Sequence, residues 1–125
     1  MSDKQPPEYA EGWGELIRAH RAYIGISQRT MAAKLNMGER SLSDIEVGRR
    51  SCPPGFLNAV QDVTQEFYRD VERVMSTAST WSDDNDGDMM ELPINDDPKR
   101  EWSRAVIHRA AVESGDIMPT IVGDA

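Results

Sequence analysis

Residues 26–50 have the sequence ISQRTMAAKLNMGERSLSDIEVGRR, and this segment decides the fold. It predicts two short helices joined by a tight turn. Ser27 is a suitable N-cap for the first helix, because its hydroxyl can accept an N–H of the first turn. Asn36 tolerates the left-handed backbone that a sharp turn needs. Gly38 can begin the second helix, and Gly48 is expected to end it.

Each of these two helices has one apolar face. Met31, Ala32 and Leu35 form the face of the first helix, and Leu42 and Ile45 form that of the second. A helix as short as the second, with so few apolar side chains, is poorly stable alone. We therefore expect its outer polar surface to be presented to a partner.

This segment resembles the helix-turn-helix of the Cro/repressor family (Xre-like), which includes the lambda-type phage repressors. The resemblance runs from Trp13 to Pro53, about a third of the chain. The family usually has Gly in the turn, where this chain has Asn36. The matching positions are Ser27-Gln28, Met31-Ala32, Leu42 and Ile45, and the closing Glu46, Gly48, Arg49, Arg50 and Pro53. The alternative is a helical hairpin with no role in DNA binding.

The resemblance implies that the second helix of the pair is a recognition helix, whose N-terminal residues contact base edges. Arg40 is the strongest candidate, because a guanidinium can bond bidentately to guanine. Glu39 and Asp44 could accept from a cytosine amino group, or could instead pair with Arg40 on a solvated face. The candidate base-reading residues are Gln28, Glu39, Arg40, Ser41, Ser43 and Asp44.

A second group of residues is expected at the DNA backbone. Arg29, Lys34, Arg49 and Arg50 are candidates for phosphate contacts, which fix register without carrying sequence information. Ser27 completes the set of predicted DNA-binding residues. The acid Glu46 is expected to be structural, bonded to an inner Arg or to a backbone donor.

Neither histidine suggests a metal site. His20 lies on the inward stripe of the first helix, so we expect a packed core residue, and no Cys is near His20 or His108 in sequence. The acidic stretch 79–88 does not fit a calcium loop, since Gly87 at its sixth position puts Pro93 where a bidentate Glu belongs. The sequence predicts no metal, no cofactor and no catalytic residue, and we do not expect an enzyme.

The charge is unevenly distributed along the chain. The formal net charge is -8. Residues 15–50 nevertheless contain seven Lys/Arg and four Asp/Glu, whereas the chain from Thr77 onward contains four Lys/Arg and eleven Asp/Glu. Because salt confines the effect of exposed charges to about 8–10 Å, a local basic surface can still attract phosphate.

Cys52 is the one cysteine, so no disulfide within the chain is expected. No signal peptide and no apolar run long enough to cross a membrane is visible. We therefore expect a cytoplasmic protein of a bacterial or phage-infected cell, acting on the nucleoid, with no membrane partner.

The expected fold class is mainly α. We expect a disordered segment 1–8, a lambda-repressor-like helix-turn-helix domain over 9–53, a long connecting helix over 54–78, an acidic loop over 79–88 and a C-terminal dimerisation element over 89–125. That element is expected to be strand-helix-strand, with strands at Met89–Ile94 and Ile117–Val122. Between them, Asp97 and Pro98 should begin a helix that Gly115 ends.

The long helix has more apolar surface than a small domain can cover. We expect this surplus, together with the last helix, to form a homodimer interface. The predicted interface residues are Val63, Phe67, Val71, Val74, Trp102 and Val106. Packing within one chain is the alternative.

Together these features predict a dimeric repressor of transcription that binds a palindromic site in double-stranded DNA, is autoregulatory, and belongs to a phage or mobile element. The layout is also similar to that of the anti-CRISPR-associated autorepressors of phages. The alternative is an antitoxin that neutralises a second protein through the acidic C-terminal half.

Overall fold

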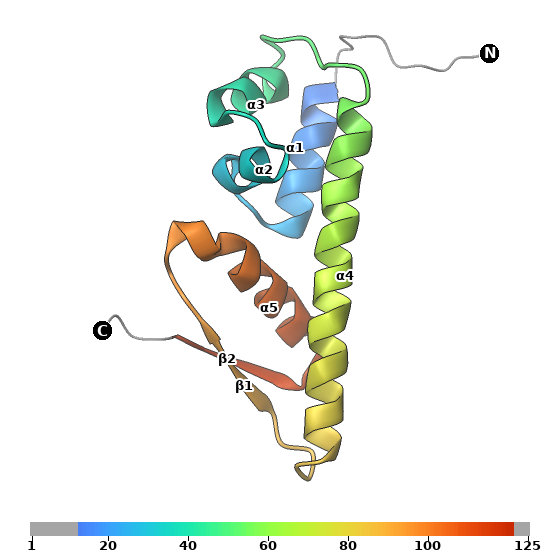
Figure 1. Ribbon diagram of the computed structural model, residues 1–125, viewed down its shortest axis with the longest axis vertical. Helices are drawn as coiled ribbons and strands as arrows, with labels where there is room; N and C mark the ends of the chain where they lie inside the picture. The colour runs from blue at the N-terminus through green and yellow to red at the C-terminus, as the bar shows by residue number, and fades with distance from the viewer. Residues whose placement is uncertain (1–12, 122–125) are drawn as a thin grey trace, which may run out of the picture. The chain divides into compact units, whose positions relative to one another are not determined.

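The computed structural model describes residues 13–121 and is mainly helical (Figure 1). The predicted disordered segment 1–8 and Val122 lie outside the described residues. The chain divides into two compact units, residues 1–65 and 66–125. The elements are α1 (Trp13–Ile24), α2 (Gln28–Lys34), α3 (Glu39–Glu46), α4 (Phe56–Asp83), β1 (Met90–Ile94), a 3₁₀ helix η1 (Pro98–Arg100), α5 (Glu101–Ser114) and β2 (Ile117–Ile121).

The predicted start and end signals of α2 and α3 are confirmed. Ser27 is the N-cap of α2, and its Oγ accepts the backbone N–H of Thr30 at 3.3 Å. Asn36 has a φ of 59° in the turn that follows α2, and Gly38 is the N-cap of α3. Gly48, at a φ of 84°, turns the chain away after α3.

The core of the first unit is formed by side chains from α1, α2, α3 and the start of α4. α3 packs against both α1 and α2. The approach of α1 to α3 is close, because a Cβ added at Gly14 would lie 2.5 Å from the carbonyl oxygen of Ile45. The buried apolar residues of this unit are Ile17, Ile24, Ile26, Met31, Ala32, Leu42, Ile45, Cys52, Val60 and Val63.

The second unit contains the predicted strand-helix-strand element. β1 and β2 pair in parallel, from Met90 beside Ile117 to Ile94 beside Ile121, and α5 packs on both strands. The carboxylate of Asp97 accepts the Lys99 N–H at 3.0 Å, which caps η1 ahead of α5. Gly115 ends α5 in the left-handed conformation, at a φ of 76°.

Prolines lie on both outer edges of this two-stranded sheet. The Met90 N–H donates to the Asp116 carbonyl, so the backbone polar groups of alternate residues from Met90 onward point into the pair. Pro93 of β1 and Pro119 of β2 consequently face outward, where their missing N–H groups cost no bond between the strands. At its proline, each edge has no N–H group to donate to a further strand. This disfavours pairing of the edges with another strand.

α4 is longer than the sequence predicts. The helix was expected to end at residue 78 and an acidic loop to begin at 79, but residues 79–83 belong to α4. Ala78 and Ser82 are both buried, so burial of one face carries the helix past the last apolar residue of the predicted stripe. The chain turns after Asp83, with positive φ at Asp86 and Gly87.

The apolar stripe of the second half of α4 is covered within the chain. Phe67 is fully buried, Val71 and Val106 are buried, and Val74 and Trp102 are half-buried. Trp102 packs edge-on against Phe67, with ring centroids 5.4 Å apart, and donates from Nε1 to Asp70 at 2.9 Å. These residues and the buried Val63 are therefore not a surplus surface. Packing within one chain, the alternative that the sequence left open, accounts for the burial of these residues, and the dimer interface stays a prediction.

No helix among the described residues is both long and apolar enough to cross a lipid bilayer.

Candidate nucleic-acid interface

α3 buries one side and exposes the other. Leu42, Ile45 and Glu46 are buried against the rest of the first unit, whereas Glu39 and Arg40 in its first turn are exposed. The remaining polar residues of the helix, Ser41, Ser43 and Asp44, are half-buried. The exposed end of α3 is thus the N-terminal end, at which the resemblance places the base-reading residues.

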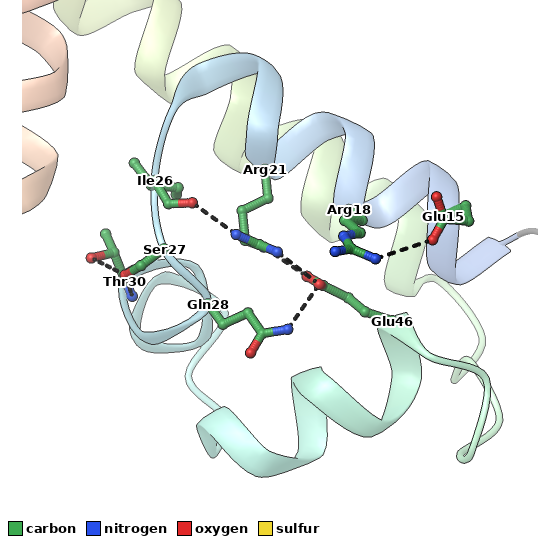
Figure 2. A network of polar contacts seen from close by, with 8 residues as sticks. All are labelled: Glu15, Arg18, Arg21, Ile26, Ser27, Gln28, Thr30 and Glu46. Atoms are coloured by element: carbon green, nitrogen blue, oxygen red, sulfur yellow. Dashed lines mark hydrogen bonds and ion pairs between the residues drawn. The ribbon is translucent and has the colours of Figure 1, made fainter.

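The buried acid Glu46 anchors α3 to the two helices before it (Figure 2). Its carboxylate accepts Nε of Arg21 at 2.9 Å and a second guanidinium nitrogen of Arg21 at 3.0 Å. Arg21 also donates to the carbonyl oxygen of Ile26 at 3.2 Å, at the start of the segment that leads into α2. The structural role predicted for Glu46 is confirmed, and its inner partner is Arg21 of α1.

Gln28 belongs to the same network. Its Nε2 donates to Oε1 of Glu46 at 2.9 Å, so the amide nitrogen is already bonded inside the protein (Figure 2). The amide oxygen of Gln28 has no such contact in the part of the chain that the structure describes. Gln28 therefore orients α2 on α3, and its amide nitrogen is not available to a base in this arrangement.

Asp44 and Ser41 are bonded to the two arginines that follow α3. Arg49 Nη1 lies 3.5 Å from Oδ1 of Asp44, and Arg50 Nη1 donates to Oγ of Ser41 at 2.9 Å. The sequence left open a pairing of Asp44 with Arg40. The structure instead pairs Asp44 with Arg49, a residue in the loop beyond the helix.

The remaining predicted DNA-binding residues, on α3 and α2, differ in the polar contacts that they make within the protein. Glu39 and Arg40 make no hydrogen bond or ion pair with the residues that the structure describes. On α2, Arg29 is exposed, while Lys34 is half-buried and has a polar contact. Ser27 uses its hydroxyl to cap α2, which gives this predicted DNA-binding residue a structural role.

The sequence analysis missed one residue on this surface. Val47 is the C-cap of α3 and its N–H still bonds to the Ser43 carbonyl, so it continues the helix by one position. Its side chain is 54% exposed, one turn beyond Ser43. The signal in the sequence is the position of Val47 directly before Gly48, the residue expected to end the helix.

His20 is less buried than the packed core residue that the sequence predicts. It is half-buried, and its Nδ1 lies 3.2 Å from Oγ1 of Thr64. Among residues 13–121, no cluster of three or more His, Cys, Asp or Glu side chains could hold a metal ion.

The cationic residues outnumber the acids in this region. Residues 28–50 contain five Lys/Arg and three Asp/Glu, and one of the acids, Glu46, is neutralised by Arg21. The second unit carries fourteen Asp/Glu and six Lys/Arg. A polyanion would therefore be attracted to the α2–α3 region and repelled by the other unit.

Comparison with protein-family models, with curated proteins and with solved structures finds no match for this chain.

Proposed function

We propose that this protein is a sequence-specific, double-stranded DNA-binding repressor of transcription. The observation that carries the proposal is the arrangement of α3, whose inner face is buried and anchored through Glu46 while Glu39 and Arg40 project from its first turn. A short helix held in this way can enter a major groove without unfolding. The N-terminal residues of such a helix are the ones that meet base edges.

The electrostatic pattern supports DNA over a protein as the partner of this surface. Arg29, Arg40, Arg49 and Arg50 are exposed around the α2–α3 pair. Guanidinium groups bond to phosphate oxygens and to the O6 and N7 atoms of guanine. The excess of acids in the second unit would keep that unit away from the duplex.

A dimer follows from the small number of base-reading side chains. One bidentate contact contributes only about 1–3 kcal/mol of discrimination between bases. Two copies on half-sites about 34 Å apart would double the number of base contacts and bind a palindromic site. Polymerase would then be blocked by occupancy of the operator.

Selection of binding sites from random duplex DNA tests the proposal. We expect enrichment of a consensus with two-fold symmetry, and sedimentation of the protein on that site as two copies per duplex. Failure to enrich any sequence would remove the proposed function.

Arg40→Ala should relax the preference at one base pair of each half-site and cost about 1–3 kcal/mol of binding free energy. Arg69→Ala is the matched control, because Arg69 is an exposed arginine of the second unit. If the two variants bind the selected site equally well, Arg40 does not read a base.

A further inference from the structure

The chain folds back onto α3 immediately after the helix ends. The backbone N–H groups of Arg49 and Arg50 both donate to the carbonyl oxygen of Asp44, at 2.8 and 3.2 Å. The left-handed backbone of Gly48 makes this reversal possible. The two arginines are thus fixed beside α3 by their main chain before their side chains are considered.

The side chains of Arg49 and Arg50 are also bonded to α3. Asp44 forms an ion pair with Arg49, and Ser41 accepts a hydrogen bond from Arg50. Each arginine is therefore restrained twice, by its backbone and by a polar side chain of α3. Glu39, Arg40 and Ser43 have no such restraint from the residues that the structure describes.

We propose that Asp44 and Ser41 are positioning residues, which hold the guanidinium groups of Arg49 and Arg50 against the end of α3 for contact with DNA phosphates. Within α3, direct selection of bases is then confined to Glu39, Arg40 and Ser43. This inference rests on the proposed function and divides the surface of α3 into a base-reading start and a phosphate-binding end.

The restraint matters for binding more than for folding. The Arg49 side chain is 76% exposed, and exposed ion pairs contribute little to stability. A long side chain that is already oriented loses less conformational freedom when it meets its ligand. An unpaired carboxylate at this place would instead repel phosphate, so Asp44 favours DNA binding only while Arg49 is present.

A double-mutant cycle on the selected DNA site tests the pairing of Asp44 with Arg49. We expect Asp44→Asn to weaken binding by about two- to tenfold, the cost of ordering one long side chain. In the Arg49→Gln background the same change should no longer weaken binding, because only repulsion of phosphate is then removed. Asp44→Glu, which retains the carboxylate, should recover part of the loss.

The salt dependence of binding gives a readout that a change in fold stability would not move. Arg49→Gln should lower the magnitude of the slope of log K against log salt by about one, the value of one phosphate contact. Asp44→Asn should lower the magnitude of this slope by a similar amount. The double variant should lower it no further than either single variant. Ser41→Ala should weaken all sequences alike and leave the selected consensus unchanged.

Glu15→Gln is the control for loss of a negative charge, since Glu15 is a 73% exposed acid of α1 in the same unit. An Asp44→Asn variant that binds more tightly in both backgrounds would show that Asp44 only repels phosphate. Loss of preference at one base pair in Asp44→Asn or Ser41→Ala would show that the residue reads a base. Either result overturns the inference while the parent protein still selects its site, whereas failure of the parent to select any site overturns the proposed function itself.

Discussion

Arg21 of α1 and Glu46 in the last turn of α3 form a two-point ion pair inside the first unit. The guanidinium Nε lies 2.9 Å from Oε2, a second nitrogen lies 3.0 Å from Oε1, and the Glu46 side chain is only 1% exposed. The two residues are 25 positions apart in sequence. The pair therefore ties the first helix to the end of α3 and sets the angle at which α3 is presented.

Removal of the Glu46 charge should destabilise the first unit strongly. In Glu46→Gln the guanidinium of Arg21, 17% exposed, loses its carboxylate partner, and breaking a buried pair from one side costs about 3–5 kcal/mol. We expect a loss of about 3 kcal/mol in the free energy of unfolding, measured by urea denaturation. Glu15→Gln breaks the exposed pair with Arg18 and should cost less than about 1 kcal/mol. Equal losses in the two variants would mean that the buried pair does not hold α3.

Gly14 should not tolerate a side chain. A Cβ at this position would lie 2.5 Å from the carbonyl oxygen of Ile45 and closer still to that of Glu46, so α1 and α3 would have to separate. We expect Gly14→Ala to lower the free energy of unfolding by about 1–3 kcal/mol, although alanine is the better helix former. Differential scanning calorimetry measures the effect.

Gly38 is the control position for the effect of a side chain at Gly14 on stability. A Cβ there would meet nothing within 4 Å, and the residue is the N-cap of α3. Gly38→Ser should be neutral or stabilising, because serine is a preferred N-cap. A Gly14→Ala variant as stable as Gly38→Ser would disprove the close contact between α1 and α3.

Phe67→Asp should unfold the second unit and should not simply separate a dimer into folded monomers. Phe67 is fully buried against Trp102, and Arg109 lies over its ring at 5.8 Å, so a carboxylate there would lose most of its hydration. We expect the cooperative unfolding transition of this unit to be lost. Far-ultraviolet circular dichroism measures that transition. Arg69→Asp, on an exposed position of the same helix, should retain the transition. A folded monomeric Phe67→Asp protein would return Phe67 to the dimer interface.

Cys52 should react slowly with alkylating reagents. The residue is 8% exposed, and burial raises the pKa of its thiol. Because the thiolate is the reactive form, a raised pKa leaves less of it at neutral pH, and the rate should climb only at more alkaline pH than for a free cysteine. Iodoacetamide labelling followed by mass spectrometry should show slow modification that becomes fast in urea. Equal rates in buffer and in urea would contradict the burial of this thiol.

Local features of the structure could be predicted from the sequence, because they depend on residues within one or two turns of each other. The Ser27 cap, the left-handed Asn36, the Asp97–Pro98 start and the Gly115 end are each set by one residue and its immediate backbone. The strand-helix-strand order of the second unit follows from the same kind of signal.

The extent of α4 and the partners of its apolar stripe could not be predicted in this way. The sequence places an acidic loop from residue 79, yet burial of Ala78 and Ser82 carries the helix to Asp83. The sequence does not show what covers the apolar stripe through Phe67. In the structure Trp102, 35 positions later, packs against Phe67. Hydrophobic periodicity identifies an apolar face but not the surface that buries it.

The sequence by itself determined that this chain is mainly helical. It also determined where α2 and α3 lie and at which residues they begin and end, since capping and turn preferences act over short distances. Only the tertiary structure decided that Glu46 pairs with Arg21 and Asp44 with Arg49, and that Arg40 remains exposed at the start of α3. The physical reason is that an ion pair depends on which charged groups the packed core brings within about 4 Å, and this distance is set by the approach of whole helices.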